Sequence, residues 1–416
     1  MDDFDTFPIG ESAKFRLVFF ISCINEDRNK NPTTSTTQKI QKKIMASNRN
    51  PNATQDEFKD PHAAVVRAID AGFGLIKYSF ESDAKDGVDF GHFFSSATLA
   101  DMSNVGKMGS QRNTVDVPVG NQWYEVGPDI TKAQGGDEFG RDLTDGYIKT
   151  PTYEALMKGA LAYIDEPVID MLVVGLPVNT FQQQSNIDFL QEKYCGDITI
   201  SRDKSVLVKR VEVRPQPQGG FFEVLQHAES LNELLQKENS TLGQINSFAD
   251  FNHTAVLVVD PGEFTLDYLL IDGGGINMKG SSAIMNAGRH RTVTAVADAL
   301  GNLIGKQVPA ATLPRINEHL RTGKSLPILG KAYDLKAFKS EFDQSIKDPL
   351  NQMFAHLGNL VDKVELIMVT GGHPAAYAEY FRVRYPNIPV FVPPSSIYSN
   401  ARGFQFMGEE LLRRGK

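Results

Sequence analysis

The sequence predicts an α/β fold built from two related halves. Apolar strands alternate with helical segments along the chain, and AVVRAIDAGFGLIKYSF at 64–80 matches AVLVVDPGEFTLDYLLI at 255–271 in its pattern. Each stretch has an apolar strand, an Asp, a turn that contains Gly, and a second strand. In addition, a buried strand at 366–369 leads directly into Gly371 and Gly372. Two copies of one turn, facing one another across a cleft, are the arrangement that this pattern favours.

The first 62 residues are predicted to form a disordered or extended segment. Between residues 25 and 60 the chain is rich in Asn, Thr, Gln, Ser and Lys, and Ile40, Ile44 and Met45 are almost its only apolar residues. Such a stretch buries too little surface to offset its ordering entropy. The apolar run at 15–23 has one basic flank and no small-residue cleavage site, so it is a poor signal peptide.

Elements of the first half follow from alternation, turn signals and helical periodicity. They are a hairpin of strands 65–70 and 75–80, a strand pair at 115–119 and 123–126, a helix over 152–163, and a buried strand over 171–174. The second half is predicted to contain a helix over 222–235, strands over 255–259 and 266–271, a long helix over 335–361 that Pro349 should kink, a strand over 366–369, and a last helix over 403–413.

Composition excludes several classes of function. The 416 residues carry a formal net charge of -8, which argues against a basic footprint over the whole surface and so against direct wrapping of DNA. Two cysteines, Cys23 and Cys195, are too few for a disulfide framework or a Cys-based zinc site and favour a reducing, cytoplasmic setting. No run reaches the ~18 apolar residues of a membrane-spanning helix, so no membrane partner is expected.

The repeated turn suggests phosphate and metal chemistry. Asp70 and Asp260 hold the same place in the two copies, as do Gly72 and Gly262. A glycine after the acid lets backbone N–H groups approach an anion, and an Asp at a strand end can hold Mg²⁺ through waters. One such turn would usually be an ordinary tight turn. Two copies and a strand ending in Gly-Gly favour a clamp around a phosphate chain.

Further segments extend the pattern and carry a resemblance to a known family. They are Lys77 beyond the first turn, VVGLPVNTF at 173–181, VEVRPQPQGGFFEVL at 211–225, DPGEFTLD at 260–267, VTGGHPAAYAEYF at 369–381, and SNARGFQFMGEELL at 399–412. In this order they resemble the actin/Hsp70/sugar-kinase ATPase superfamily, and within it the plasmid-segregation actin-like proteins of the ParM/StbA type. The resemblance covers about residues 64–412.

The resemblance implies an actin-like fold with two related RNase H-like domains around a nucleotide cleft. Residues 63–180 would form the first part of domain I with an inserted subdomain, and 181–254 its remainder with a connecting segment. Residues 255–398 would form domain II, and 399–416 a helix that returns to domain I. The sequence departs from the family at Pro261 and Glu263, where small residues are common, so the second phosphate loop could be shaped differently.

The resemblance also implies site residues. Asp70 and Asp260 would hold Mg²⁺ through waters, Lys77 would contact the β- and γ-phosphates, and Gln216 would orient the attacking water, with Gln218 as its alternative. Asp70, Asp260 and Gln216 would thus carry catalysis, with Asp260 also helping to polarise the water. The nucleotide, ATP with GTP possible, would contact Gly72, Phe73, Gly74, Lys77, Gly262, Thr265, Asn286, Arg289, Gly371 and Gly372.

The function implied is an ATPase that forms filaments and moves plasmid or other replicon DNA through a DNA-binding adaptor. Its filaments would grow by self-association. Two alternatives stay open. A non-filament ATPase of the superfamily, either chaperone-like or a cell-division scaffold, would need a substrate domain or a membrane tether. A small-molecule kinase would need a substrate pocket with its own catalytic Asp.

Overall fold

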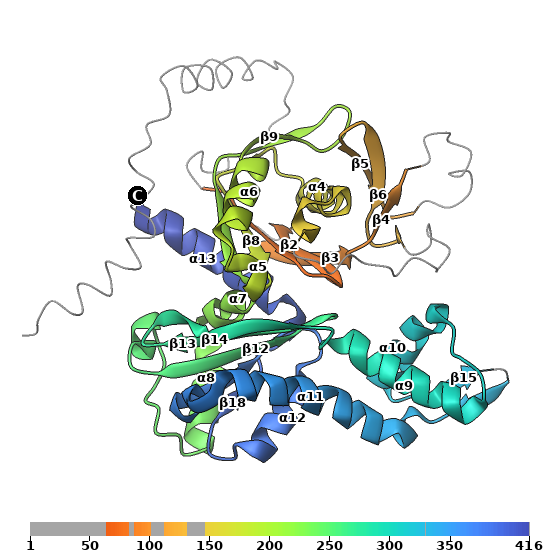
Figure 1. Ribbon diagram of the computed structural model, residues 1–416. Coiled ribbons are helices and arrows are strands. Elements are labelled where there is room, and N and C mark those ends of the chain that lie inside the picture. The colour runs from red at the N-terminus through yellow and green to blue at the C-terminus, as the bar shows by residue number, and fades with distance from the viewer. Residues whose placement is uncertain (1–63, 83–86, 101–111, 131–145, 329, 416) are drawn as a thin grey trace, which may run out of the picture. The chain divides into compact units, whose positions relative to one another are not determined.

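The computed structural model describes residues 64–82, 87–100, 112–130, 146–328 and 330–415. By its contacts the chain divides into residues 1–63 and residues 64–416, and all that follows concerns the second unit (Figure 1). The segment 1–62, for which the sequence predicts disorder, lies outside the described residues.

The first half is built on a five-stranded sheet. Its strands lie in the order β11 (Val211–Pro215), β8 (Met171–Leu176), β1 (Val66–Ala71), β2 (Leu75–Glu81) and β3 (Val88–Phe94). The central strand β1 is antiparallel to β2 and parallel to β8. This confirms the predicted hairpin and the buried strand that follows it.

The second half repeats this sheet. Its strands lie in the order β18 (Val390–Phe391), β17 (Val364–Val369), β12 (Ala255–Pro261), β13 (Thr265–Asp272) and β14 (Gly275–Met285). The strand β12 is antiparallel to β13 and parallel to β17, as β1 is to β2 and β8. Since strand order and strand directions agree, the prediction of an α/β fold with two related halves is confirmed.

Smaller elements complete the first half. They are β4 (Ala97–Leu99), β5 (Val115–Val119) and β6 (Gln122–Val126) in one sheet, β7 (Val168–Ile169), β9 (Gly196–Thr199) and β10 (Ser205–Val208) in another, the 3₁₀ turn η3 (Tyr147–Lys149), and the helices α4 (Pro151–Ile164), α5 (Val178–Phe181) and α6 (Gln184–Tyr194). The predicted pair at 115–126 and the predicted helix over 152–163 are thus confirmed. Thr150 caps α4 by accepting a hydrogen bond from the Tyr153 N–H, and Pro151 opens the helix.

The chain between the two sheets forms α7 (Gln216–Glu223), η4 (Val224–His227), α8 (Ala228–Lys237) and η5 (Phe248–Phe251). The prediction of one helix over 222–235 is wrong. Every residue of α7 is buried, whereas α8 buries only Leu231 and Leu235, so the two helices meet different surroundings. At their junction His227 leaves the helical region, with φ -121° and ψ 25°.

The remaining helices follow the second sheet. They are α9 (Arg289–Ile304), η6 (Ala310–Thr312), α10 (Leu313–Thr322), η7 (Leu335–Phe338), α11 (Lys339–Leu357), η8 (Gly358–Lys363), α12 (Pro374–Arg384), η9 (Ser396–Tyr398) and α13 (Ser399–Gly415), with β15 (Leu326–Ile328) and β16 (Lys331–Tyr333) as a hairpin. The long predicted helix is present as η7, α11 and η8, and α11 continues through Pro349. The last helix begins at Ser399, four residues earlier than predicted.

Strand β12 organises the core of the second half because its side chains alternate between the two faces of the sheet. Leu257 and Val259 join an apolar cluster with α11 and α12. Val256 and Val258 join another on the opposite face, with residues of α7 and α8. A strand buried on both faces reads as a continuous apolar run, which is why the sequence identified it.

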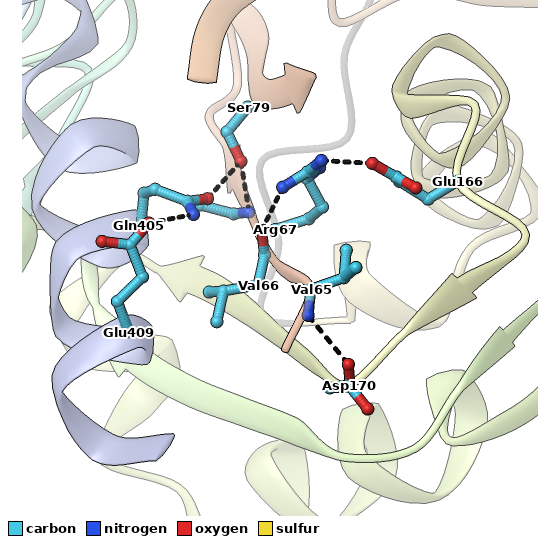
Figure 2. Close-up of polar contacts among 9 residues, drawn as sticks. Val65, Val66, Arg67, Ser79, Glu166, Asp170, Gln405 and Glu409 are labelled. Carbon is cyan, nitrogen blue, oxygen red and sulfur yellow. Dashed lines mark hydrogen bonds and ion pairs between the residues drawn. The ribbon is translucent and has the colours of Figure 1, made fainter. Parts of the chain in front are cut away.

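Helix α13 returns to the first half and is bonded to its sheet through side chains. Figure 2 shows the chain of contacts: the Ala68 N–H donates to Ser79 Oγ at 2.7 Å, and Ser79 Oγ donates to Gln405 Oε1 at 2.7 Å. The amide of Gln405 in turn donates to Glu409 Oε1 at 2.7 Å. In the same view, Arg67 pairs with Glu166 and the Val65 N–H donates to Asp170. The bond between Ser79 and Gln405 thus connects α13 to β2, and Ser79 in turn is bonded to β1.

Helices α7 and α13 cross at two glycines. A Cβ on Gly219 would lie 2.6 Å from the Asn400 Cα, and a Cβ on Gly403 would collide with the backbone carbonyl of Gly219. Both obstacles are backbone atoms, which cannot rotate away. The crossing therefore requires glycine at both positions, and it fixes the start of α13 against α7.

A further bond joins the halves at the first connecting segment. The Val178 N–H, at the start of α5, donates to Asp267 Oδ1 in β13 at 2.8 Å. Asp267 is buried, and burial raises its pKa to about 7, while hydrogen bonds from Thr265 and Val178 act in the opposite direction. The carboxyl group of Asp267 is therefore held partly protonated at neutral pH.

Replacing either crossing glycine by alanine is expected to destabilise the chain by about 1–3 kcal/mol, because the added methyl group must displace backbone. Alanine elsewhere in a helix stabilises relative to glycine by roughly 0.5–1 kcal/mol. Gly415→Ala provides the control, since a Cβ on Gly415, also in α13, meets open space. Urea unfolding measures all three variants. If Gly403→Ala and the control were equally stable, this would contradict the close crossing of α7 and α13 at Gly403.

Asp267→Asn is expected to stabilise the chain at pH 8 by about 1–3 kcal/mol and to change little at pH 4. An unfolded Asp loses its proton near pH 4, whereas folded Asp267 keeps its proton up to about pH 7. The unfolded state therefore binds fewer protons between these pH values, and wild-type stability falls as pH rises. Asparagine does not ionise and still accepts from Val178. Urea unfolding at both pH values checks this, and a stability difference that is the same at pH 4 and pH 8 would disprove it.

Candidate functional site

Two carboxylates from equivalent positions of the two halves lie together. Asp70 near the end of β1 and Asp260 near the end of β12 are 0% and 7% exposed. The amide of Asn400, in the first turn of α13, donates to Asp260 Oδ2 at 2.7 Å and lies 3.4 Å from Asp70 Oδ2. The pairing of Asp70 with Asp260 was a sequence prediction, and the bridging amide was not.

Lys77 is the cation next to this pair. It stands opposite Asp70 in the β1–β2 register, and its Nζ lies 2.7 Å from Asp70 Oδ2. Burial alone would lower the pKa of Lys77, but Asp70 and Asp260 outweigh burial and raise it, so the ammonium group stays charged. Burial raises the pKa of Asp260, and the neighbouring Asp70 adds to this, against Lys77 and Asn400.

Two buried glutamines come from the start of α7. Gln216 Nε2 donates to Asp70 Oδ1 at 2.9 Å, so the residue that the resemblance implies for catalysis contacts the carboxylate pair directly. Gln218 is equally buried, and no described residue donates a hydrogen bond to its Oε1. Of the two glutamines, Gln216 is the one that the structure places on Asp70.

The first turn is held by internal bonds. The Gly72 N–H donates to Asp70 O at 3.1 Å, and Ser95 in the loop after β3 binds both Gly72 O and Gly74 O. A Cβ on Gly72 would lie 3.0 Å from the Leu75 carbonyl oxygen, so glycine allows the tight approach of backbone within this turn. Phe73 points into the core, with its ring 5.1 Å from that of Tyr147.

The second turn is bonded to the start of α9. The Gly262 N–H donates to Thr265 O at 2.9 Å, while Gly262 O and Glu263 O accept from the N–H groups of Arg289 and His290. Thr265 is buried beside Asp267 and hydrogen-bonds to it. The turn is thus shaped by α9 rather than by a run of small residues.

The two turns touch one another at Glu263. A Cβ on Gly74 would collide with the Glu263 side chain. Burial lowers the pKa of Arg289, and the negative charge of Glu263 acts in the opposite direction. Pro261 stays within β12 and pairs with Leu266. Glu263, which stands where the family commonly has a small residue, therefore forms the contact between the two turns. Its negative charge lies near Arg289.

The glycine pair after β17 packs directly on Asp260. Gly371 has φ +76°, a conformation that favours glycine, and a Cβ there would collide with Asp260 Oδ1. Ser396 Oγ donates to Gly371 O at 2.8 Å and fixes this turn. A Cβ on Gly372 would meet open space, so Gly372 lines an accessible surface.

Arg289 and Asn286 lie farther along the second half. Arg289 Nε donates to Asn317 Oδ1 at 2.8 Å, and its guanidinium lies 6.0 Å from the centroid of the Phe342 ring. His373 lies near Arg289, and burial and that arginine lower its pKa to about 4, so it is neutral at physiological pH. Asn286 lines a groove of about 630 Å³ between α9 and α11, and the other residues that line this groove also belong to the second half.

Sequence reasoning missed Asn400, Ser95, Asn317 and His373. Asn400 and His373 lie in the motifs SNARGF and VTGGHP, but nothing in the local sequence distinguishes them from ordinary loop or helix residues. Ser95 and Asn317 carried no signal, because their contacts come from the fold.

The donor set of the carboxylate pair suits Mg²⁺. Carboxylate and amide oxygens are the ligands that this hard cation prefers, and it usually keeps several waters. In the part of the chain that the structure describes, no three His, Cys, Asp or Glu side chains converge as a metal site. Two carboxylates without further protein ligands fit an ion held partly through waters and phosphate oxygens.

No helix among the described residues is long and apolar enough to cross a membrane.

Part of the chain matches a known protein family. Residues 68–219 match the family of actin-like proteins, N-terminal domain. No curated protein sequence matches the chain.

Solved structures share the fold over most of the chain. The archaeal actin homologue Ta0583 has a TM-score of 0.62 at 16% identity and covers 85% of this chain and 100% of its own. The pSK41 ParM protein without ligand has 0.55 at 18% identity, with coverage of 84% and 98%. A 15-stranded ParM filament from Clostridium botulinum has 0.59 at 16%, with coverage of 83% and 99%. The chain therefore has an actin-like fold, as its motifs predicted, and its residues 68–219 match the N-terminal domain of actin-like proteins.

Proposed function

We propose that this chain is an ATPase that assembles into filaments and uses them to segregate plasmid or other replicon DNA in the cytoplasm. The observation that supports the proposal most is the carboxylate pair Asp70 and Asp260, brought together from two equivalent hairpins with Lys77 and Gln216 on Asp70. Such an arrangement suits binding of a phosphate chain and its metal ion from both sides.

Residues of both halves would hold the nucleotide. Asp70 and Asp260 would bind Mg²⁺ through waters, and Mg²⁺ would neutralise charge that builds up on the phosphate oxygens. Lys77 would exchange its bond with Asp70 for phosphate oxygens, a small movement for a flexible ammonium group. Gly72 and Gly74 on one side, and Gly262 and Thr265 on the other, would line the phosphates, with Phe73 anchoring the first turn.

The chain's own part in hydrolysis is positioning. Gln216 is fixed by its bond to Asp70, so its amide has one orientation in which to hold a water molecule. Asp260 would help to polarise that water. Gly371, Gly372 and Arg289 would lie on the nucleoside side, with Asn286 more distant. ATP is the expected nucleotide and GTP a second one to test, supported by an archaeal actin homologue of the same fold solved with ADP.

Filament formation is the second part of the proposal. ParM and Alp12 filaments have this fold, at TM-scores of 0.59 and 0.53. Head-to-tail contacts between identical subunits give open filaments when the rotation does not close. With a net charge of -8 the chain would reach DNA through a DNA-binding adaptor rather than by direct contact.

Asp260→Asn is expected to lower ATP hydrolysis by about 100-fold, because the charge that holds the metal ion from the second half is lost. Asp272→Asn is the matched control, since Asp272 lies in the same hairpin at its far end, exposed and paired with Ala255. Phosphate release at saturating ATP and Mg²⁺ measures both variants. Normal hydrolysis by Asp260→Asn would refute the assignment of the site.

Purified wild-type chain is expected to sediment as filaments when ATP and Mg²⁺ are present, and to remain in the supernatant with ADP or with EDTA. A non-hydrolysable ATP analogue should give longer-lived filaments if hydrolysis weakens the contacts between subunits. Pelleting and electron microscopy measure this. Nucleotide hydrolysis without assembly at any protein concentration would instead favour a non-filament ATPase, and phosphate transfer to a small alcohol would favour a kinase.

A further inference from the structure

Asn400 is the described residue whose side chain hydrogen-bonds to both carboxylates of the site. Its Nδ2 donates to Asp260 Oδ2 at 2.7 Å and lies 3.4 Å from Asp70 Oδ2. The two carboxylates come from different halves, and Asn400 comes from a third element, α13. One uncharged amide thus bridges two like charges in a buried site, where unsatisfied charge is costly.

Among the residues that the structure describes, the other end of this amide has no hydrogen-bond partner. Asn400 is 3% exposed, and no described residue donates a hydrogen bond to its Oδ1. Turning the amide over would place Oδ1 against two carboxylates, which repel it, so the two carboxylates account for the orientation of the amide. An acceptor that is buried without a donor carries a free-energy cost of about 1–3 kcal/mol.

The backbone of Asn400 cannot move to relieve this cost. Its Cα and carbonyl group pack against Gly219 of α7 so closely that a Cβ on Gly219 would collide with them. A Cβ on the nearby Gly403 would likewise collide with the Gly219 carbonyl oxygen. The side chain is therefore presented to the carboxylates from a fixed point, and only rotation of the amide is available to it.

A cation held through waters would supply the missing donors. Waters bound to Mg²⁺ are strongly polarised donors and need acceptors around them. We infer that Asn400 is a positioning residue for the divalent cation of this site: its N–H₂ group bridges Asp70 and Asp260 in the metal-free chain, and its Oδ1 accepts from a metal-bound water in the loaded chain. This inference rests on the proposed function, since it takes the ion to bind with a nucleotide.

Asparagine suits both states for a chemical reason. Its amide carries a donor and an acceptor, and rotation about one bond exchanges them. Aspartate offers acceptors alone, so it would serve the loaded chain and repel the carboxylates in the metal-free chain. Leucine, of similar size, offers neither group. Comparing asparagine, aspartate and leucine at position 400 therefore separates a role in metal binding from a role in packing.

The test compares Asn400→Leu with Gln405→Leu. Gln405 is a buried amide on the same helix, and its hydrogen bonds go to Ser79 and Glu409 (Figure 2). The quantity measured is the ratio of ATP affinities with and without Mg²⁺, by titration of a fluorescent ATP analogue. Mn²⁺ replaces Mg²⁺ in a second series, in which electron paramagnetic resonance reports the bound ion directly.

Asn400→Leu is expected to reduce this ratio by about 10–100-fold, as does the loss of other residues that orient metal ligands. Gln405→Leu should lower the melting temperature and leave the ratio unchanged. Asn400→Asp should keep or increase the ratio while lowering the melting temperature of the metal-free chain, and it serves if the leucine variant does not fold. An unchanged ratio in Asn400→Leu, or a reduced ratio in Asn400→Asp, would overturn the inference.

Failure of the proposed function gives a different result. If the wild-type chain binds no nucleotide, or binds it equally with and without Mg²⁺, the proposed function fails and the inference falls with it. If the wild-type chain requires Mg²⁺ and Asn400→Leu requires it equally, the inference alone fails.

Discussion

Burial of two like charges against one another is the constraint on which the rest of this structure depends. Asp70 and Asp260 lie almost out of contact with solvent, and such a pair is costly unless donors and cations surround it. Lys77, Gln216 and Asn400 provide them, from β2, α7 and α13. Because these elements are far apart in the sequence, the carboxylates are satisfied only when both sheets and both helices have formed.

The crossing of α7 and α13 connects the carboxylate pair to the rest of the fold. Each helix begins with an amide that bonds to the carboxylates, and each contacts the other through a glycine a few residues later. Only a few residues of regular helix therefore separate the crossing from the carboxylates, and a regular helix bends little. The bond between Gln405 and Ser79 connects α13 to β2 as well.

Local patterns in the sequence identified much of the fold and part of the site. The repeat was visible because a strand, an Asp and a glycine turn lie within about ten residues, and hydrogen-bond register then determines where Asp70 and Lys77 lie. Asn400 was out of reach, because it meets Asp70 from 330 positions away. The helix over 222–235 was predicted as one because apolar spacing does not reveal that α7 is enclosed on all sides while α8 is not.

The register also separates the two halves. The residue opposite Asp70 is Lys77, whereas the residue opposite Asp260 is Asp267. A chain made of two copies of the first half would carry two ammonium groups for two carboxylates, and two copies of the second would carry four carboxylates and no cation. The mixed pair has one ammonium group and three acidic side chains, of which Asp267 is held partly protonated, so the negative excess is at most two charges, which one divalent ion can balance. The halves share an architecture, yet neither could replace the other, so the carboxylate site that they form together is chemically one-sided.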